Sequence, residues 1–197
     1  MSSRDTILNA LRRNAPPLSP APRMPEGITY PDPEKQFAAA FTSVGGEFVR
    51  VPDYATLNVE LDKLPYYTNA HRIVSLVEGV GTPNVALDSI QDPHALEGVD
   101  LAIIPGEFGV AENGAVWIPG SALGSQRAVY VISEHLVLVV AADRLVSNMH
   151  QAYERVKIER PGFGLFISGP SKTADIEQAL VIGAHGPRSC TLYMVGP

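Results

Sequence analysis

The chain has 197 residues, of which 45% are hydrophobic and 18% charged, and this length and composition suit one globular domain with a substantial core. Its formal net charge of −6, with no basic run, argues against a nucleic-acid partner, because such binding depends on clustered lysines and arginines that neutralise phosphates. Cys190 is the only cysteine, which excludes an intramolecular disulfide, a thiolate zinc site and a four-cysteine iron–sulfur cluster within this chain.

The N-terminal region is predicted to be a short helix on a proline-rich arm. Apolar residues recur at helical spacing from Ile7 to Leu11, after a serine or aspartate that can cap a helix. Prolines then crowd residues 16–33, and such a segment neither propagates a helix nor donates a regular strand ladder. We therefore expect a helix and an extended arm over residues 1–33, followed by one α/β domain over residues 34–197.

The hydrophobic pattern also bears on localisation. The N-terminus lacks the apolar run of a signal peptide, and the longest apolar stretch, residues 136–142, is far shorter than the ~20 residues that cross a bilayer. We expect a cytoplasmic protein without a membrane span.

From Asp32 onward the pattern alternates between helix and strand. Asp32 and Pro33 are typical of a helix start, and the pair Gly45-Gly46 is typical of a helix end. The expected order is a helix over 33–44, a strand over 47–51, a helix from 53 or 56 to 64, and a buried strand over 73–77.

The second half continues the alternation. Asn113-Gly114 lies between two β-capable runs and predicts a hairpin with a two-residue turn. The other expected elements are strands over 101–104, 129–132, 136–140 and 163–167, a helix from Ser147 to about 158, a helix between about 171 and 182, and a last strand over 191–195 that closes the sheet. These elements predict an open, mainly parallel, twisted sheet with helices on both faces and one antiparallel hairpin. Ligands are then expected at the carboxyl ends of strands, in the loops after Ile104 and Ile167.

The segment 167–177 is the strongest candidate for a binding site. It is predicted to leave a strand, turn through Gly169-Pro170 and enter a helix, whose unpaired N–H groups and dipole favour an anion such as a carboxylate or phosphate. Lys172 would add a full positive charge. Alternatively, Ser171 or Thr173 only caps the helix and Asp175 complements its dipole. The glycine spacing of a P-loop is absent.

A second candidate lies in residues 183–188, where His185 and Arg188 share a loop with two glycines and a proline. An imidazole beside a guanidinium can bind or protonate an oxyanion, although a loop histidine beside an arginine is also typical of a solvated turn. His135, which precedes an apolar run, either faces the same pocket or lies at a strand edge.

Residues 169–177 and 183–188 together resemble the signature ending of LutC-like lactate-utilization (LUD) proteins. Upstream, residues 109–116 resemble the family pattern Gly-Ile-Ala-Glu-Thr-Gly-Thr-Val, with Asn113 in place of the first threonine. The resemblance implies a fold like the sugar-phosphate isomerase (NagB/RpiA) and CoA-transferase superfamily. It also implies a non-redox subunit of a three-component system that oxidises L-lactate to pyruvate, with no cofactor in this chain and iron–sulfur clusters on partner subunits.

These observations lead to one hypothesis for the site. We expect a single pocket for a small carboxylate such as lactate or pyruvate, with Glu112 or His185 as the group that handles protons. Lys172 and Arg188 would hold the carboxylate, and hydroxyls would donate hydrogen bonds. The binding residues would be Asn113, Ser168, Ser171, Lys172, Thr173, Asp175 and Arg188.

Two other functions stay open. The run Ala111-Glu112-Asn113-Gly114 resembles the Ser-Glu-Asn-Gly element of CoA transferases, in which the glutamate is a nucleophile, so Glu112 could serve an acyl-CoA transferase or hydrolase. Alternatively, Glu112 is a polar residue before a turn and the chain only binds or senses a small carboxylate. The N-terminal helix is expected to contact another chain, either an identical copy or an iron–sulfur partner.

Overall fold

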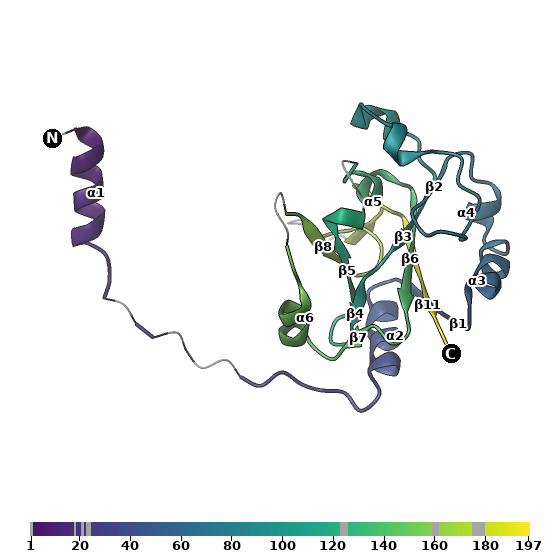
Figure 1. Ribbon diagram of the computed structural model, residues 1–197, viewed down its shortest axis with the longest axis horizontal. Helices are drawn as coiled ribbons and strands as arrows, with labels where there is room; N and C mark the ends of the chain where they lie inside the picture. Colours follow the sequence, from purple (N-terminus) through teal and green to yellow (C-terminus); the bar gives the residue numbers. More distant parts are fainter. Residues whose placement is uncertain are drawn as a thin grey trace.

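The computed structural model describes residues 2–17, 19–20, 22, 25–122, 126–158, 162–174 and 180–197 (Figure 1). Within these residues the helices are α1 (Ser3–Arg13), α2 (Pro33–Ser43), α3 (Tyr54–Leu61), α4 (Pro65–Thr68), α5 (Val129–Ile132) and α6 (Met149–Arg155). The strands are β1 (Glu47–Val51), β2 (Ile73–Ser75), β3 (Leu101–Pro105), β4 (Phe108–Val110), β5 (Ala115–Pro119), β6 (His135–Ala141), β7 (Leu145–Val146), β8 (Gly164–Ile167), β9 (Lys172–Ala174), β10 (Leu180–Ile182) and β11 (Ser189–Val195).

The core is a five-stranded sheet in the order β1-β11-β6-β3-β2, and every pairing in it is parallel. Alternate residues of each strand face opposite sides, so Leu138 of β6 packs with α2 and α5, whereas Val137 packs with α3 and α4. Helices therefore cover both faces, and the predicted α/β class with a mainly parallel sheet is confirmed. The central strands β3 and β6 are apolar on both sides because neither face meets water.

A second sheet, in the order β7-β4-β5-β8, lies on the α2 side of the main sheet, and α6 packs on its other face. Strands β4 and β5 form the predicted antiparallel hairpin, but the turn is longer than predicted. Val110 pairs with Ala115, so residues 111–114 make a four-residue loop. Asn113 accepts a hydrogen bond from the Ala115 N–H, and Gly114 takes a positive φ of 66°.

Two elements between β5 and β8 differ from the prediction. Residues 129–132 form the helical turn α5 instead of a strand, because two residues before β6 leave no room for the crossover that a parallel sheet needs. The burial pattern of α5 also agrees with a helical turn, since the consecutive residues Val129 and Tyr130 are both buried. The next helix, α6, is capped by Asn148 instead of Ser147 and ends at Arg155, before the predicted position 158.

The predicted helix over 171–182 is wrong within the described residues. Lys172–Ala174 and Leu180–Ile182 are the strands β9 and β10 of an antiparallel pair. Gly169 has a φ of 71°, which turns the chain before β9, and the β-branched Thr173, Val181 and Ile182 suit a strand. The last strand expected over 191–195 lies within β11, which pairs with β1 on one side and β6 on the other and so lies inside the sheet.

The N-terminal helix stands clear of the body at the end of the arm (Figure 1). Ser2 caps it through a reciprocal hydrogen-bonded box with Asp5, and none of its residues is buried. The arm joins the body near α6, where Asn148 donates to the Ile28 carbonyl and the Tyr30 N–H donates to Ser147 Oγ. No helix in the described part of the chain is long and apolar enough to cross a membrane.

Candidate functional site

Lys172 lies at the carboxyl end of α2. Its ammonium donates hydrogen bonds to the carbonyl oxygens of Val44 at 2.8 Å, Ser168 at 3.1 Å and Pro170 at 3.1 Å. The last carbonyls of a helix carry the negative end of its dipole, so the cation is stabilised there. An ammonium has three N–H donors, and all three are engaged. Lys172 therefore joins α2 to the 168–170 turn, which differs from the predicted position at a helix N-terminus.

The hairpin loop and the same turn are linked directly. Ser168 Oγ donates to the Asn113 carbonyl at 2.8 Å, and a Cβ at Gly114 would lie 2.6 Å from the Phe41 backbone nitrogen in α2. Glu112 points the other way, because its Oε2 accepts the Met149 N–H at 2.9 Å. Its carboxylate thus stabilises the start of α6.

The two C-terminal segments meet as the sequence predicted. The Ser171 N–H donates to the Pro187 carbonyl, and the Gly183 N–H donates to the Ser171 carbonyl, both at 2.9 Å. Arg188 pairs through Nη1 with Glu134 at 2.7 Å, and its side chain is 68% exposed. His185 is exposed on the same loop, Thr173 lies in β9, and Asp175 falls outside the described residues.

A polar cluster that was not predicted from the sequence lies beside this loop. The Tyr66 and Thr191 hydroxyls are 2.7 Å apart, and Thr191 donates to Glu47 at 3.2 Å. The Tyr66 ring stacks on His135 with centroids 4.6 Å apart, and His135 Nδ1 lies 2.8 Å from Ser189 Oγ. One signal was available: three of the strands begin with Glu47, His135 and Ser189, and parallel strands begin at one edge of a sheet.

Burial sets the electrostatics of these groups. Desolvation raises the pKa of Tyr66 to about 12 and lowers the pKa of His135, against the attraction of Glu134. Desolvation also lowers the pKa of Lys172 and raises the pKa of Cys190 to about 12. Near neutral pH the cluster therefore presents a neutral imidazole and an un-ionised phenol, beside the charged pair of Arg188 and Glu134.

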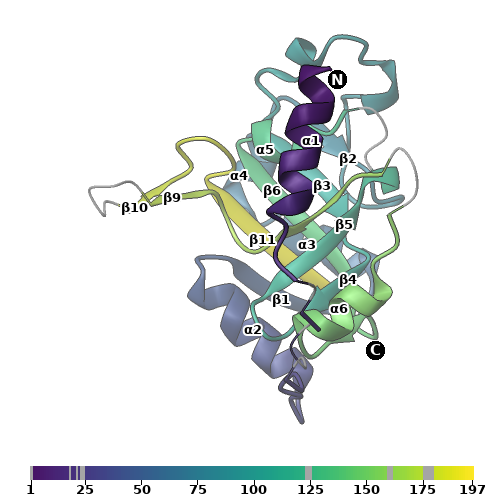
Figure 2. The same cartoon turned by 90° about the vertical axis from the view of Figure 1, so that its left-hand side faces the viewer.

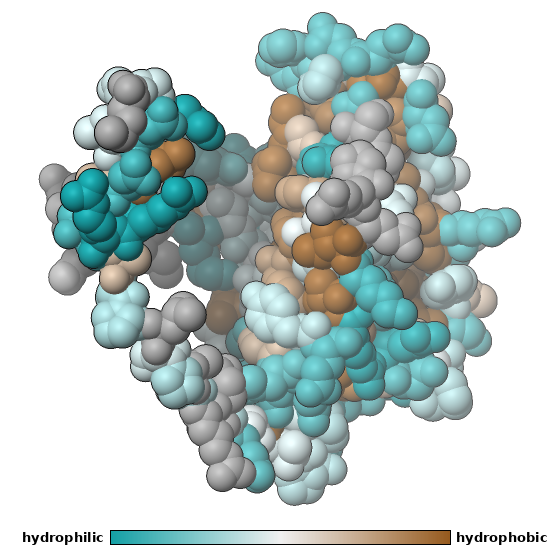
Figure 3. Space-filling model, turned by 60° about the vertical axis from the view of Figure 1, so that its left-hand side comes forward, coloured by the Kyte–Doolittle hydropathy of each residue, from teal (hydrophilic) through white to brown (hydrophobic). Residues whose placement is uncertain are grey.

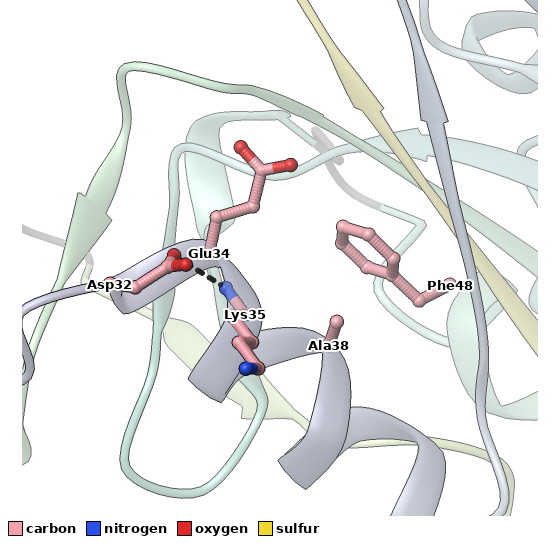
Figure 4. A pocket seen from close by; sticks show the side chains of 5 residues that line it. All are labelled: Asp32, Glu34, Lys35, Ala38 and Phe48. Carbon is pink, nitrogen blue, oxygen red and sulfur yellow. Dashed lines mark hydrogen bonds between the residues drawn. The ribbon is translucent and has the colours of Figure 1, made fainter.

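A separate cavity of about 360 Å³ lies between the start of α2 and β1 (Figure 4). Its lining residues are Asp32, Glu34, Lys35, Ala38 and Phe48. Asp32 accepts the Lys35 N–H as the cap of α2, and Glu34 pairs with Arg50 at 3.0 Å. Its acidic groups thus have structural partners, and it contains none of the predicted site residues. Among the described residues, no group of three or more His, Cys, Asp or Glu side chains could hold a metal ion.

The gathered groups lie at the amino ends of β1, β11 and β6, not at the carboxyl ends where ligands were expected. The reason is that β8 belongs to the second sheet and runs antiparallel to β5, so the turn after it reaches Val44, just before β1. The loop after β3 lies elsewhere, with Gly106 beside Val140 at the other end of β6. Chemically, this amino edge offers hydroxyls, a neutral imidazole and the exposed residues His185 and Arg188, a set suited to a small organic anion.

The fold and this edge define an α/β protein with a parallel five-stranded core and a second, mixed sheet packed on one face. The LUD domain family matches residues 84–195, more than half of the chain, and the chain belongs to that family. This confirms the resemblance seen in the C-terminal motifs.

Individual relatives agree with this assignment. Lactate utilization protein C of Deinococcus radiodurans is 28% identical over 200 residues, which cover 97% of this chain and 92% of that protein. Lactate utilization protein C of Shouchella clausii is 34% identical over 123 residues, 57% of this chain, and the match spans about half of that relative, 53% of its length. The crystal structure of a DUF162 family protein from Deinococcus radiodurans has the same fold, with a TM-score of 0.58 and 17% identity over 83% of this chain and 96% of that one.

Proposed function

We propose that this chain acts in lactate utilization as a non-redox subunit of a system that oxidises L-lactate to pyruvate. The observation that carries the proposal is the alignment with lactate utilization protein C of Deinococcus radiodurans, which extends over nearly the whole of both chains. An alignment of that extent includes both the candidate site and the preceding half of the fold.

The cysteine content supports a role that depends on partners. Cys190 is the only cysteine, it is buried, and one thiolate cannot hold an iron–sulfur cluster. Electron transfer would then fall to partner subunits with iron–sulfur clusters, and this chain would bind the small carboxylate or the partners themselves.

We place the carboxylate at the amino edge, with Arg188 as its main ligand. The described contacts of the Arg188 guanidinium engage Nη1 with Glu134, and a guanidinium has five N–H donors, enough to accept a carboxylate in two-point geometry as well. His185, exposed three residues earlier, is the proposed proton-handling group, because the Glu112 carboxylate is held at the start of α6. Asn113, Ser168 and Lys172 would position the surrounding turns.

The test compares two charge-removing variants. Titration calorimetry with lactate and with pyruvate should show binding to the wild-type chain, weakened about tenfold or more in Arg188→Ala, since a charge-assisted hydrogen bond contributes about 1.5–3 kcal/mol. Lys172→Met should instead lower the free energy of unfolding. Under conditions in which this variant is fully folded, its affinity for the two acids should change less than the affinity of Arg188→Ala. If the wild-type protein binds neither lactate nor pyruvate, the proposed carboxylate site is wrong.

A growth experiment tests the role in lactate utilization separately from the proposed binding site. Deleting the chain from its source organism should prevent growth on lactate while leaving growth on pyruvate unchanged, and wild-type protein should restore it. Normal growth of the deletion strain on lactate would contradict the role in lactate utilization, whatever the calorimetry shows.

A further inference from the structure

The two edges of the main sheet are closed differently. Its outer strands are β1 and β2, which Figure 2 shows on opposite sides of the sheet. At the β2 edge the Ile73 N–H donates to Asn84 Oδ1, and the Ile73 carbonyl accepts the N–H groups of Asn84 and Val85. The chain that follows β2 thus occupies the outward backbone groups of that strand, which protects it from pairing with another chain.

The β1 edge has no such cover in the described part of the chain. The Gly196 N–H donates to the Val51 carbonyl, so alternate residues of β1, Val49 and Val51, direct their backbone groups toward β11. Phe48 and Arg50 therefore direct theirs away from β11. Among the described residues, no hydrogen bond from another segment reaches these four groups, two N–H donors and two carbonyl acceptors.

The β1 edge is distinguished by its backbone and not by its hydropathy. Figure 3 shows hydrophobic and hydrophilic residues interspersed over one face of the body, and scattered apolar side chains do not mark an interface. The side chains of residues 48–50 are half-buried, so β1 is held in place by its own packing. A fixed strand with a free edge is a template on which a second extended chain can pair.

The spacing of the free groups favours a second copy of this chain as the partner. Phe48 and Arg50 lie symmetrically about Val49, so a two-fold axis at Val49 places Phe48 of each copy opposite Arg50 of the other. An antiparallel pair in this register makes four hydrogen bonds, which satisfy all the free groups of both strands. Glu47 then lies opposite Val51, so that no like charges are opposed.

Neighbouring two-fold registers satisfy fewer groups. An axis at Phe48 would place Arg50 opposite Gly46, whose N–H already donates to the Phe41 carbonyl. An axis at Arg50 would place Phe48 opposite Pro52, which has no N–H, and would set the two Arg50 side chains directly against each other. The sequence of β1 therefore suits the register centred on Val49.

We propose that two copies of the chain join their β1 strands in antiparallel pairing about Val49, so that two five-stranded sheets become one sheet of ten strands. Opposed residues of antiparallel strands face the same side, so both α2 helices lie on one face of the joined sheet. The cavity between α2 and β1, which Phe48 lines, is beside this edge (Figure 4). The contact then includes α2 as well as the strands, and a stable dimer needs more buried area than two short strands provide.

Disulfide formation tests the register. The two Val49 residues would form a non-hydrogen-bonded pair with Cα atoms about 4.5 Å apart, within reach of a disulfide. Val49→Cys should therefore give a disulfide-linked dimer of the full chain on mild oxidation, while the buried Cys190 does not react. Glu47→Cys is the matched control on the same side of β1, because the two copies of that residue would be about 14 Å apart. The dimer yield of Val49→Cys should exceed the control yield several-fold, although Glu47 is the more exposed residue.

Solution mass and amide hydrogen exchange give the second measurement. The wild-type chain should be a dimer by light scattering, with slow exchange of the Phe48 and Arg50 amides. Val49→Lys sets two ammonium groups against each other across the axis and should be a monomer in which these amides exchange fast. Val49→Thr keeps an uncharged β-branched side chain and should stay dimeric.

Three outcomes would overturn the proposal. These are a monomeric wild type, whose β1 edge would then be open to a different protein, equal disulfide yields from Val49→Cys and Glu47→Cys, and fast exchange of the Phe48 and Arg50 amides in the wild-type chain. If Val49→Lys does not fold, as circular dichroism would show, the disulfide comparison still decides. None of these outcomes depends on lactate binding.

Discussion

Gly114 is the point where the hairpin loop meets α2, and replacing it tests whether the loop is held as the structure indicates. A Cβ at this position would lie 2.6 Å from the backbone nitrogen of Phe41 and 2.7 Å from its Cα, and the residue has a φ of 66°. Gly114→Ala should therefore cost about 1–2 kcal/mol for the left-handed backbone and about 1–3 kcal/mol more for forcing a helix backbone to move. The expected loss is about 2–5 kcal/mol.

Gly79 provides the matched control, because it has a φ of 76° and its Cβ position has no heavy atom within 4 Å. Gly79→Ala should lose only the backbone contribution of about 1–2 kcal/mol. Urea denaturation monitored by fluorescence gives both free energies of unfolding, provided that the slopes agree. Equal losses in the two variants would refute the close contact between the loop and α2, and with it the rigid placement of Glu112 and Asn113.

Two further predictions concern titratable groups. Burial raises the pKa of Cys190 to about 12, so a thiol reagent at about pH 8 should label the native chain far more slowly than the urea-unfolded chain, and equal rates would show that β11 is not packed in the sheet. Asp53 caps α3 by accepting the Thr56 N–H at 2.7 Å, and this hydrogen bond lowers its pKa. A lowered folded-state pKa gives stability that is full above the unfolded value of about 3.9 and is lost as the pH falls through the folded value. Asp53→Asn keeps a cap that does not titrate, so its free energy of unfolding should fall less than that of the wild type between about pH 7 and pH 3, and an identical fall would contradict the assignment.

The elements that local chemistry specifies were predictable. The strands β3 and β6 are apolar runs bounded by turn residues, and α2 has an aspartate cap followed by proline. The failures lie where tertiary context decides. Residues 129–132 have strong β propensity, yet α5 forms there because the parallel sheet has no place for a strand directly before β6. A one-turn helix of this kind leaves no periodic signal.

The candidate site, too, was predictable only where local chemistry specifies it. The sequence indicated which residues matter to the turns, since Ser168, Ser171, Lys172 and Arg188 all take part in contacts between distant segments. It could not indicate the partners of Lys172 and Arg188, because Val44 and Glu134 belong to other parts of the chain that only the sheet order brings near. Lys172 was therefore predicted to bind an anion, whereas in the structure it donates to a carbonyl oxygen at the end of α2.

The position of β11 explains why the two C-terminal segments meet even though the first of them was wrongly predicted to enter a helix. The last strand enters between β1 and β6, so the chain before it must arrive in the middle of the amino edge. There it lies between the loop that precedes β1, which offers Val44, and the loop that precedes β6, which offers Glu134. The first neighbour is a helix end that attracts a cation and occupies Lys172. The second is a single carboxylate that engages Nη1 of the Arg188 guanidinium, so the proposed ligand would use the remaining N–H donors of that side chain.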